Sequence, residues 1–139
     1  MEYGTELFDE LRAMELPPGD FAVFGSGPLL VRGIIQVVND FDVVCRGAAW
    51  ERARELGRLV DIDHDGVQIV STHGGAITFG ITWGYGELDI SDLIDTAETI
   101  AGLPFALLKH VVAYKQIAGR PKDLEHLRLL EQYAGGGPA

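Results

Sequence analysis

The sequence predicts an α+β fold in a single domain, because it combines helical patterns with a middle part that is rich in strand patterns. Segments with apolar residues at helical spacing lie near both ends, while short apolar runs separated by glycine-containing turns fill the middle. The chain has 139 residues, of which 47% are hydrophobic and 23% charged, and one domain usually contains about 100–200 residues. We therefore expect one domain over residues 1–133, followed by a flexible tail over residues 134–139.

The first half of the chain shows two strand signatures among amphipathic helices. The apolar run of residues 21–24 predicts a buried strand, which leads directly into the turn Gly25-Ser26-Gly27. A second run of strand length, residues 40–45, begins with aspartates. The predicted helices of this half cover residues 5–14, 28–35 and 48–59, and the last of them ends near Gly57.

The second half of the chain begins with strand signatures and ends with helical ones. The predicted strands cover residues 58–62, 67–70, 76–83 and 87–90, with polar turns between them. The predicted helices cover residues 91–100, 105–118 and 121–133. Gly119 and Pro121 separate the last two helices, as expected for a corner between helices.

The charge balance and the cysteine content restrict the compartment and the partners. A net charge of −10 argues against nucleic acid as a ligand unless a basic partner accompanies it, and against an anionic membrane surface. Cys45 is the single cysteine, which excludes an internal disulfide and fits a reducing compartment. No apolar run approaches the roughly 20 residues of a membrane span, and the first residues lack a signal-peptide pattern. We expect a cytoplasmic protein.

The most informative pattern joins the glycine-containing turn to a pair of aspartates. Asp40 and Asp42 alternate along a predicted strand, so their side chains should leave the same face, with their Cα atoms roughly 6–7 Å apart. Two carboxylates at this separation suit Mg²⁺, which also takes phosphate oxygens as ligands. Gly25, Ser26 and Gly27 lie between a strand and a helix, where a bare backbone can approach a triphosphate. The pattern predicts a site for a metal-bound nucleotide.

These residues resemble the signature of the nucleotidyltransferase superfamily, which shares the fold of DNA polymerase β. That signature is an apolar residue, Gly-Gly or Gly-Ser, a spacer, and then Asp-x-Asp or Asp-x-Glu between apolar positions. The chain has Phe24-Gly25-Ser26 followed by Asp40-Phe41-Asp42-Val43. The superfamily places a third carboxylate on a later strand between apolar residues. The sequence Leu88-Asp89-Ile90 fits this description, with Glu87 as the nearby alternative.

A second block resembles the branch that includes the AbiEii-like and minimal nucleotidyltransferases. It consists of Lys115 followed by the sequence Gly119-Arg120-Pro121-Lys122-Asp123. The resemblance implies a mixed, mostly antiparallel sheet with helices packed on one face. It also implies transfer of a nucleotidyl group from a nucleoside triphosphate to an acceptor hydroxyl, with release of pyrophosphate.

The resemblance assigns a role to each of the candidate residues. Asp40, Asp42 and Asp89 would hold Mg²⁺ or Mn²⁺ and serve catalysis, while Gly25, Ser26 and Gly27 would anchor the triphosphate. The basic side chains of Arg32, Lys115 and, more weakly, Lys122 are further candidates for contacts to its phosphates. A lysine on a helix is, however, usually solvated, and Asp123 has the position of a helix cap.

The chain departs from the family pattern upstream of the aspartates. Gln36 and Val38 stand where the branch often has Arg and Thr. The chain is also too short for a separate acceptor-binding domain, so the acceptor site is minimal or is supplied by a second subunit, as in a homodimer. These departures favour an alternative, a non-catalytic binding or regulatory module, for example in a toxin–antitoxin pair. The sequence does not identify the acceptor.

Two further patterns have structural interpretations. Residues 61–66 match the Asp-x-Asp-x-Asp-Gly start of a calcium loop, but the twelfth position, which requires a bidentate Glu, is Thr72. We interpret this segment as an acidic hairpin turn between strands. The four histidines show no shared metal spacing, and we interpret His110 and His126 as surface or packing residues on helices.

Overall fold

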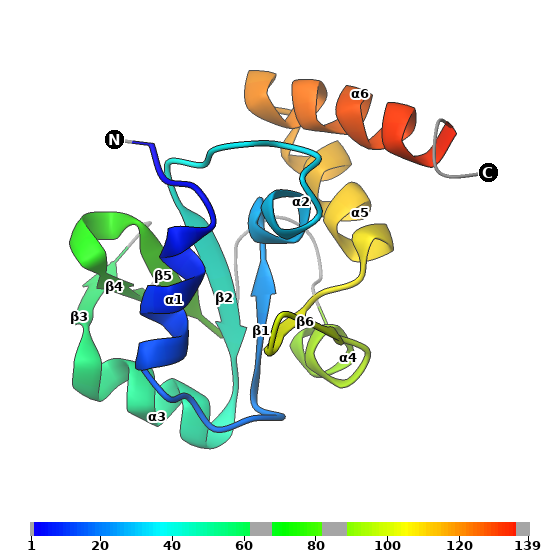
Figure 1. The fold of residues 1–139 in the computed structure, drawn as a ribbon. Helices are drawn as coiled ribbons and strands as arrows, with labels where there is room; N and C mark the ends of the chain where they lie inside the picture. Colours follow the sequence, from blue (N-terminus) through cyan, green and yellow to red (C-terminus); the bar gives the residue numbers. More distant parts are fainter. Residues whose placement is uncertain (1, 62–67, 82–88, 136–139) are drawn as a thin grey trace.

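The computed structural model describes residues 2–61, 68–81 and 89–135, and within them seven strands form one open, mixed sheet. The strand order is β3-β4-β5-β2-β1-β7-β6 (Figure 1). Four of the six strand pairings are antiparallel, and the pairings β1–β7 and β2–β5 are parallel. The predicted α+β class and the mostly antiparallel sheet are confirmed.

The elements follow one another in an order close to the predicted one. The strands are β1 (Phe21–Phe24), β2 (Phe41–Cys45), β3 (Arg58–Asp61), β4 (Gln68–Thr72), β5 (Ile77–Gly80), β6 (Glu98–Ile100) and β7 (Leu103–Phe105). The α-helices are α1 (Glu6–Ala13), α2 (Gly27–Val31), α3 (Gly47–Leu56), α4 (Ile90–Asp95), α5 (Leu108–Ala118) and α6 (Pro121–Gly135). A short 3₁₀ turn, η1 (His73–Gly75), precedes β5.

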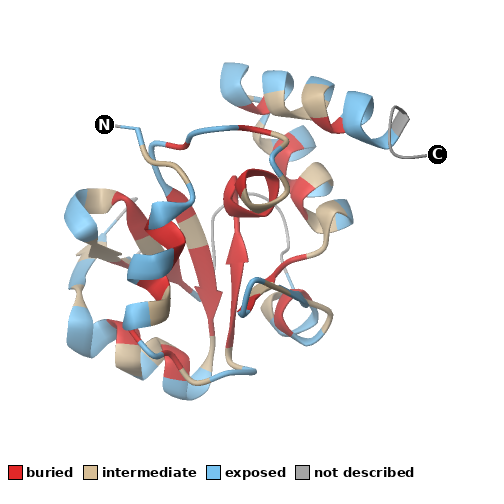
Figure 2. Cartoon of the chain, in the orientation of Figure 1, coloured by how far each residue is buried: buried red, intermediate tan, exposed pale blue. Residues whose placement is uncertain are grey.

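The core is centred on β1 and β2, which are largely red in Figure 2. Every residue of β1 is buried, and only Asp42 in β2 is partly exposed. Phe8 from α1 packs against Phe41 and Phe105, with both pairs of ring centroids 5.3 Å apart. Cys45 is buried in this core, where burial raises the pKa of its thiol to about 12.

Helices cover both faces of the sheet. A Cβ atom on Gly27, at the start of α2, would lie 2.3 Å from Val23 Cγ1, whereas Tyr114 of α5 packs against Phe24 with ring centroids 5.1 Å apart. Successive strand residues point to opposite faces, so α2 and α5 lie on opposite sides of β1. The prediction that the helices pack on one face is therefore wrong. The unbroken apolar run of β1 is typical of a strand that is covered on both sides.

The segment between α4 and α5 is a hairpin where the sequence analysis predicts parts of two helices. β6 and β7 pair antiparallel around the two-residue turn Ala101-Gly102, whose φ angles are +52° and +81°. Positive φ at both central positions is the hallmark of the tight hairpin turn that matches strand twist. Pro104 adds to this effect, because proline is poorly tolerated inside a helix.

The acidic segment of residues 61–66 connects two antiparallel strands, since β3 ends at Asp61 and β4 begins at Gln68. Residues 62–67, and with them most of the calcium-loop pattern, lie outside the described residues. The predicted tail at residues 136–139 also lies outside them. Among the helices that the structure describes, none is long and apolar enough to cross a membrane.

Candidate functional site

The turn after β1, the start of β2 and the corner between α5 and α6 meet around one pocket of about 170 Å³. The residues that line it are Gly25, Ser26, Asp40, Asp42, Tyr114, Lys115, Arg120 and Lys122. The structure thus brings together residues from both blocks of the sequence motif, although about 70 residues of chain separate Asp42 from Lys115. We call this hollow the aspartate pocket.

The two aspartates of the pocket differ in their surroundings. Asp40 is exposed and directly precedes β2, while Asp42 lies within β2 and accepts a hydrogen bond of 2.6 Å from the Thr78 hydroxyl. Burial raises the pKa of Asp42, and the negative charge of Asp40 raises it further, against the effect of the Thr78 hydrogen bond. Neither aspartate forms an ion pair with a Lys or Arg that the structure describes.

Gly25 has a backbone conformation that fits the pocket and excludes larger residues. Its φ is +65°, in the left-handed region that favours glycine. A Cβ atom at this position would lie 3.0 Å from Asp42 Oδ2. Ser26 follows as the buried N-cap of α2, and its hydroxyl accepts a hydrogen bond of 3.5 Å from Lys115 Nζ. The turn therefore brings its backbone directly against the carboxylate of Asp42.

Two of the predicted nucleotide contacts do not line the aspartate pocket. The absence of a side chain at Gly27 is required for packing, because a Cβ there would collide with Val23 of β1. Arg32 donates a hydrogen bond of 2.7 Å to the Pro28 carbonyl and pairs with Glu98 of β6. The guanidinium of Arg32 is thus engaged within the fold, since its helix ends at Val31 and leaves it facing β6.

Lys115 belongs to a buried ion-pair network at the corner between α5 and α6. Its Nζ lies 3.3 Å from Asp123 Oδ1, and the two side chains are 1% and 0% exposed. Arg120 binds the same carboxylate through Nε at 2.6 Å, and its backbone N–H also donates to Asp123 Oδ2. This last bond caps the start of α6, so the predicted capping role of Asp123 is confirmed.

The charges of this network shift the pKa values of both partners. Burial lowers the pKa of Lys115, although the carboxylate of Asp123 opposes the shift. Burial acts to raise the pKa of Asp123, but the hydrogen bond from Arg120 and the charge of Lys115 outweigh it, so the pKa is lowered. In this buried ion pair, each charge favours the charged form of the other residue.

Asp89 does not lie on a strand, so that prediction is wrong. It is the N-cap of α4, where its Oδ1 accepts a hydrogen bond of 3.0 Å from the N–H of Asp92. Aspartate at this position satisfies an otherwise unpaired N–H at the helix start, and this local bond competes with a strand conformation. Asp89 does not line the aspartate pocket. The alternative, Glu87, lies outside the described residues.

Tyr114 and Arg120 line the pocket but were not predicted as site residues, whereas Lys122 was weighed as a phosphate contact beside Lys115. The Gly-Arg-x-Lys-Asp block contains Arg120 and was the available signal. Lys122 is exposed and forms no ion pair with a described residue, and its charge lowers the pKa of Asp42. Tyr114 could not be identified in advance, because only the crossing of α5 over β1 brings it to the pocket.

Two other hollows differ in their position relative to the aspartate pocket, since one adjoins it and the other shares no residue with it. A second hollow of about 130 Å³ shares Ser26, Asp40 and Lys122 with the aspartate pocket. A larger groove of about 950 Å³ lies between α1, α3 and the turn before β5, and none of the predicted site residues line it. Size alone therefore does not point to the predicted chemistry.

Within the residues that the structure describes, no group of three His, Cys, Asp or Glu side chains could hold a metal ion. A cation at the aspartate pocket would therefore rest on two carboxylates together with oxygens of its ligand. No protein-family model, curated protein or solved structure matches this chain. The geometry and chemistry of the pocket are accordingly the basis for the function proposed below.

Proposed function

We propose that the chain is a small nucleotidyltransferase that binds a metal-bound nucleoside triphosphate in the aspartate pocket. It transfers the nucleotidyl group to an acceptor hydroxyl and releases pyrophosphate. The observation that carries this proposal is the meeting of three features around one pocket: two carboxylates without an ion-pair partner among the described residues, a glycine turn and the cation Lys122. This combination supplies ligands for a divalent cation beside a surface that suits phosphate.

The carboxylates fit a divalent cation such as Mg²⁺ or Mn²⁺. Asp40 and Asp42 offer hard oxygen ligands, and the remaining positions suit phosphate oxygens and water. Burial raises the pKa of Asp42, and a bound cation would favour its ionised form. When bound, the metal ion would neutralise charge on the phosphate oxygens and on the leaving pyrophosphate.

The residues around the carboxylates have separate tasks in this proposal. The bare backbone at Gly25 lets the triphosphate approach the aspartates, since no Cβ occupies the space beside Asp42. Lys122 supplies a positive charge that no described carboxylate pairs with. Thr78 donates to Asp42 Oδ1 and so fixes the orientation of this carboxylate. Lys115 holds the hydroxyl of Ser26 and joins the pocket wall to the α5–α6 corner.

One observation favours a second candidate, a binding module with the same fold that does not turn over. Asp89 caps α4 and does not line the pocket, so among the described residues no third carboxylate stands beside the aspartate pair. Nucleotide binding needs only the pair and the turn. Transfer also requires a positioned acceptor and stabilisation of the transition state.

Calorimetry with ATP, GTP, CTP and UTP, in the presence and absence of Mg²⁺, tests the shared part of both candidates. We expect at least one triphosphate to bind in a Mg²⁺-dependent manner, and the double variant D40N/D42N to lose this binding while remaining folded. A wild-type protein that shows no Mg²⁺-dependent binding would refute both candidates. Pyrophosphate release with candidate acceptors then separates the transferase from the binding module.

A further inference from the structure

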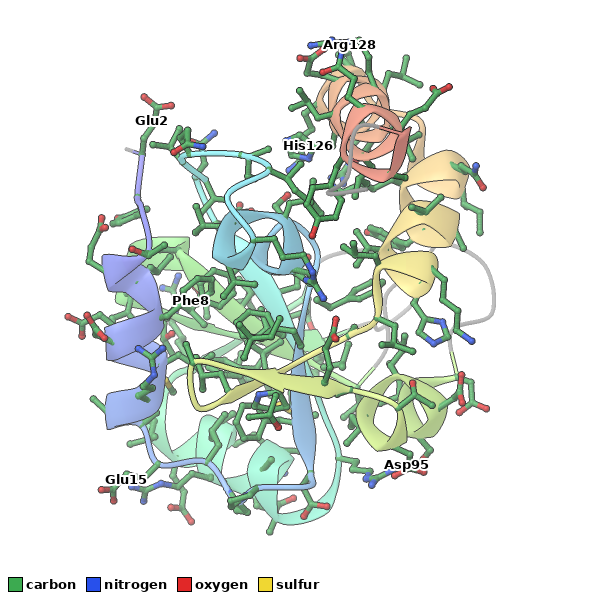
Figure 3. The ribbon with its side chains drawn as sticks, turned by 45° about the vertical axis from the view of Figure 1, so that its right-hand side comes forward. Glu2, Phe8, Glu15, Asp95, His126 and Arg128 are labelled. Carbon is green, nitrogen blue, oxygen red and sulfur yellow. The ribbon has the colours of Figure 1, made fainter. Side chains whose placement is uncertain are left out.

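The second hollow, which shares Ser26, Asp40 and Lys122 with the aspartate pocket, continues that site along α6. It measures about 130 Å³, and its other lining residues are Glu2, Val37, Val38, Asn39 and His126. His126 extends from α6 toward the segment between α2 and β2, and Glu2 lies on the N-terminal segment (Figure 3). We call this hollow the His126 pocket. Because Asp40 lines both hollows, a ligand in the aspartate pocket can extend past Asp40 into the His126 pocket.

The two adjoining pockets differ in the chemistry of their walls. The aspartate pocket contains Lys115 and Arg120 in addition to Lys122. Among the described residues that line the His126 pocket, Lys122 is the one Lys or Arg, and Glu2 and Asp40 each add a negative charge. Its remaining walls are apolar at Val37 and Val38 and polar at Ser26, Asn39 and His126. This wall composition disfavours a phosphate and suits a flat, neutral group with hydrogen-bonding edges.

His126 contributes a hydrogen-bonding group that the fold does not use. Its Nδ1 is buried and has no hydrogen-bond partner among the described residues. Burial, together with the charges of Lys115 and Lys122, lowers the pKa of His126 to about 4, so the ring is neutral near pH 7. A buried polar atom without a partner destabilises the fold, and such atoms call for a functional explanation.

The neighbours of His126 allow a ligand to complete its hydrogen bonding. Lys122 lies one helical turn before it on α6, is exposed and lines the same hollow. Its long side chain can move aside, because a lysine stem has many rotatable bonds and this one has no ion-pair partner among the described residues. A neutral imidazole has one donor and one acceptor, and the amide of Asn39 has both as well.

We propose that the His126 pocket binds the nucleobase of the triphosphate, and that His126 and Asn39 hydrogen-bond to the edge of the base. This assignment rests on the function proposed above, since it places the phosphates in the aspartate pocket and the ribose over Asp40. The valine side chains provide the apolar contact for the ring of the base. The base thereby decides which triphosphate the site prefers.

Calorimetry in Mg²⁺ with inorganic tripolyphosphate and with each of the four nucleoside triphosphates tests the assignment. We expect the preferred nucleotide to bind about tenfold more tightly than tripolyphosphate. H126F should remove this advantage and leave the affinity for tripolyphosphate unchanged. H110F is the matched control, because His110 is also a helical histidine but lines neither pocket. Equal affinities of nucleotide and tripolyphosphate in the wild type would overturn the proposal.

Two other outcomes of the H126F experiment also count against a base pocket. An equal loss of affinity for nucleotide and tripolyphosphate would mean that His126 acts on the phosphates. Unchanged nucleotide affinity with slower release of pyrophosphate would make the hollow an acceptor site. The side-chain ¹⁵N resonances of His126 in the wild type provide a second measurement that does not depend on folding of a variant. They should shift on addition of nucleotide and stay in place with tripolyphosphate, and the reverse pattern would refute the proposal.

Free nucleosides without metal separate failure of this inference from failure of the proposed function. Adenosine, guanosine, cytidine and uridine lack the phosphates that the aspartate pocket would hold. Weak nucleoside binding that depends on His126 would support the base pocket even if no triphosphate binds with Mg²⁺. Mg²⁺-dependent triphosphate binding without a base preference would support the function and refute the base pocket.

Discussion

Two carboxylates within the fold, Asp123 at the α5–α6 corner and Asp42 at the start of the central strand β2, have different charged neighbours. Their pKa values are shifted in opposite directions. Asp123 accepts hydrogen bonds from Lys115 and Arg120, and its pKa is lowered. Burial raises the pKa of Asp42 and the like charge of Asp40 raises it further, against the hydrogen bond from the Thr78 hydroxyl and the charges of Lys122 and Arg120. Among the described residues, Asp123 has ion-pair partners and Asp42 has none.

The difference separates a structural carboxylate from one that is available to a ligand. A fully paired carboxylate such as Asp123 stabilises the fold and has no remaining affinity for a cation. A buried carboxylate such as Asp42, which has no ion-paired cation among the described residues, destabilises the folded state and is stabilised when a cation binds. This is the pattern expected where part of the stability is given up for binding.

The largest expected effect follows from removing the charge of Asp123. In D123N, the buried ammonium of Lys115 loses its carboxylate, and we expect the free energy of unfolding to fall by about 3–5 kcal/mol. Urea denaturation at pH 7, followed by circular dichroism, measures this loss. E125Q is the control on the same helix, because the Glu125–Arg128 pair is solvent-exposed and its removal should change nothing measurable. A D123N protein as stable as the wild type would contradict the structural assignment.

A second prediction concerns the backbone beside Asp42. Gly25 and Gly33 have φ angles of +65° and +73°, so alanine at either position should cost about 1–2 kcal/mol of strain. A Cβ on Gly33 has no atom within 4 Å, whereas one on Gly25 meets Asp42 Oδ2 at 3.0 Å. We therefore expect similar losses of stability in G25A and G33A, but weaker Mg²⁺-dependent triphosphate binding only in G25A. Equal affinities in both variants would mean that the turn does not position the carboxylate.

Removing the charge of Asp42 should raise the free energy of unfolding, whereas removing that of Asp123 should lower it. In D42N the hydrogen bond to Thr78 can persist while the uncompensated charge disappears, so stability at pH 7 in the absence of metal should rise by about 0.5–2 kcal/mol. Addition of Mg²⁺ and triphosphate should raise the melting temperature of the wild type and leave that of D42N unchanged. A D42N variant that is less stable than the wild type would show that the charge is compensated in the fold.

The pH dependence of these two variants follows from the direction of each pKa shift. Asp42 has a raised pKa in the folded state, so the advantage of D42N should vanish at low pH, where Asp42 is protonated, and grow as pH rises above its unfolded value near 3.8. Asp123 has a lowered pKa, so its contribution is present above pH 4 and is lost as pH falls through its folded value. Unfolding experiments should therefore show the D42N difference shrinking as pH falls toward 3.8, and the D123N difference shrinking only below that value.

Much of the architecture around the pocket was predictable from the sequence, because its elements have strong local signals. The apolar run of β1 predicts a buried strand, and the glycine-containing turn and the alternation of Asp40 and Asp42 predict a shared site. The corner at Gly119 and Pro121 has the residues expected for the end of one helix and the start of the next. Such patterns depend only on residues that are close together in the sequence, so they can be recognised without knowledge of the fold.

The remaining features depend on contacts between distant segments. Nothing local distinguishes Asp42 from Asp123, since their charges are set by Thr78 and Lys115, which only the folded sheet and corner bring near them. Asp89 illustrates the reverse error, because an apolar–Asp–apolar pattern suits both a strand and a helix start. There the local hydrogen bond to Asp92 prevailed.

The smallest expected effect extends the comparison to the two basic residues Arg32 and Lys122. Arg32 is 11% exposed and bonds to the Pro28 carbonyl and to Glu98, so R32Q should lose about 1 kcal/mol of stability and keep its affinity for Mg²⁺-bound triphosphate. Lys122 lines the aspartate pocket without an ion-pair partner among the described residues, so K122Q should keep its stability and bind triphosphate roughly tenfold more weakly. Calorimetry and urea denaturation of both variants provide the four measurements. If R32Q weakened binding and K122Q did not, the phosphates would lie on the α2–β6 side of the molecule. Arg32, and not Lys122, would then be the basic residue available to the ligand.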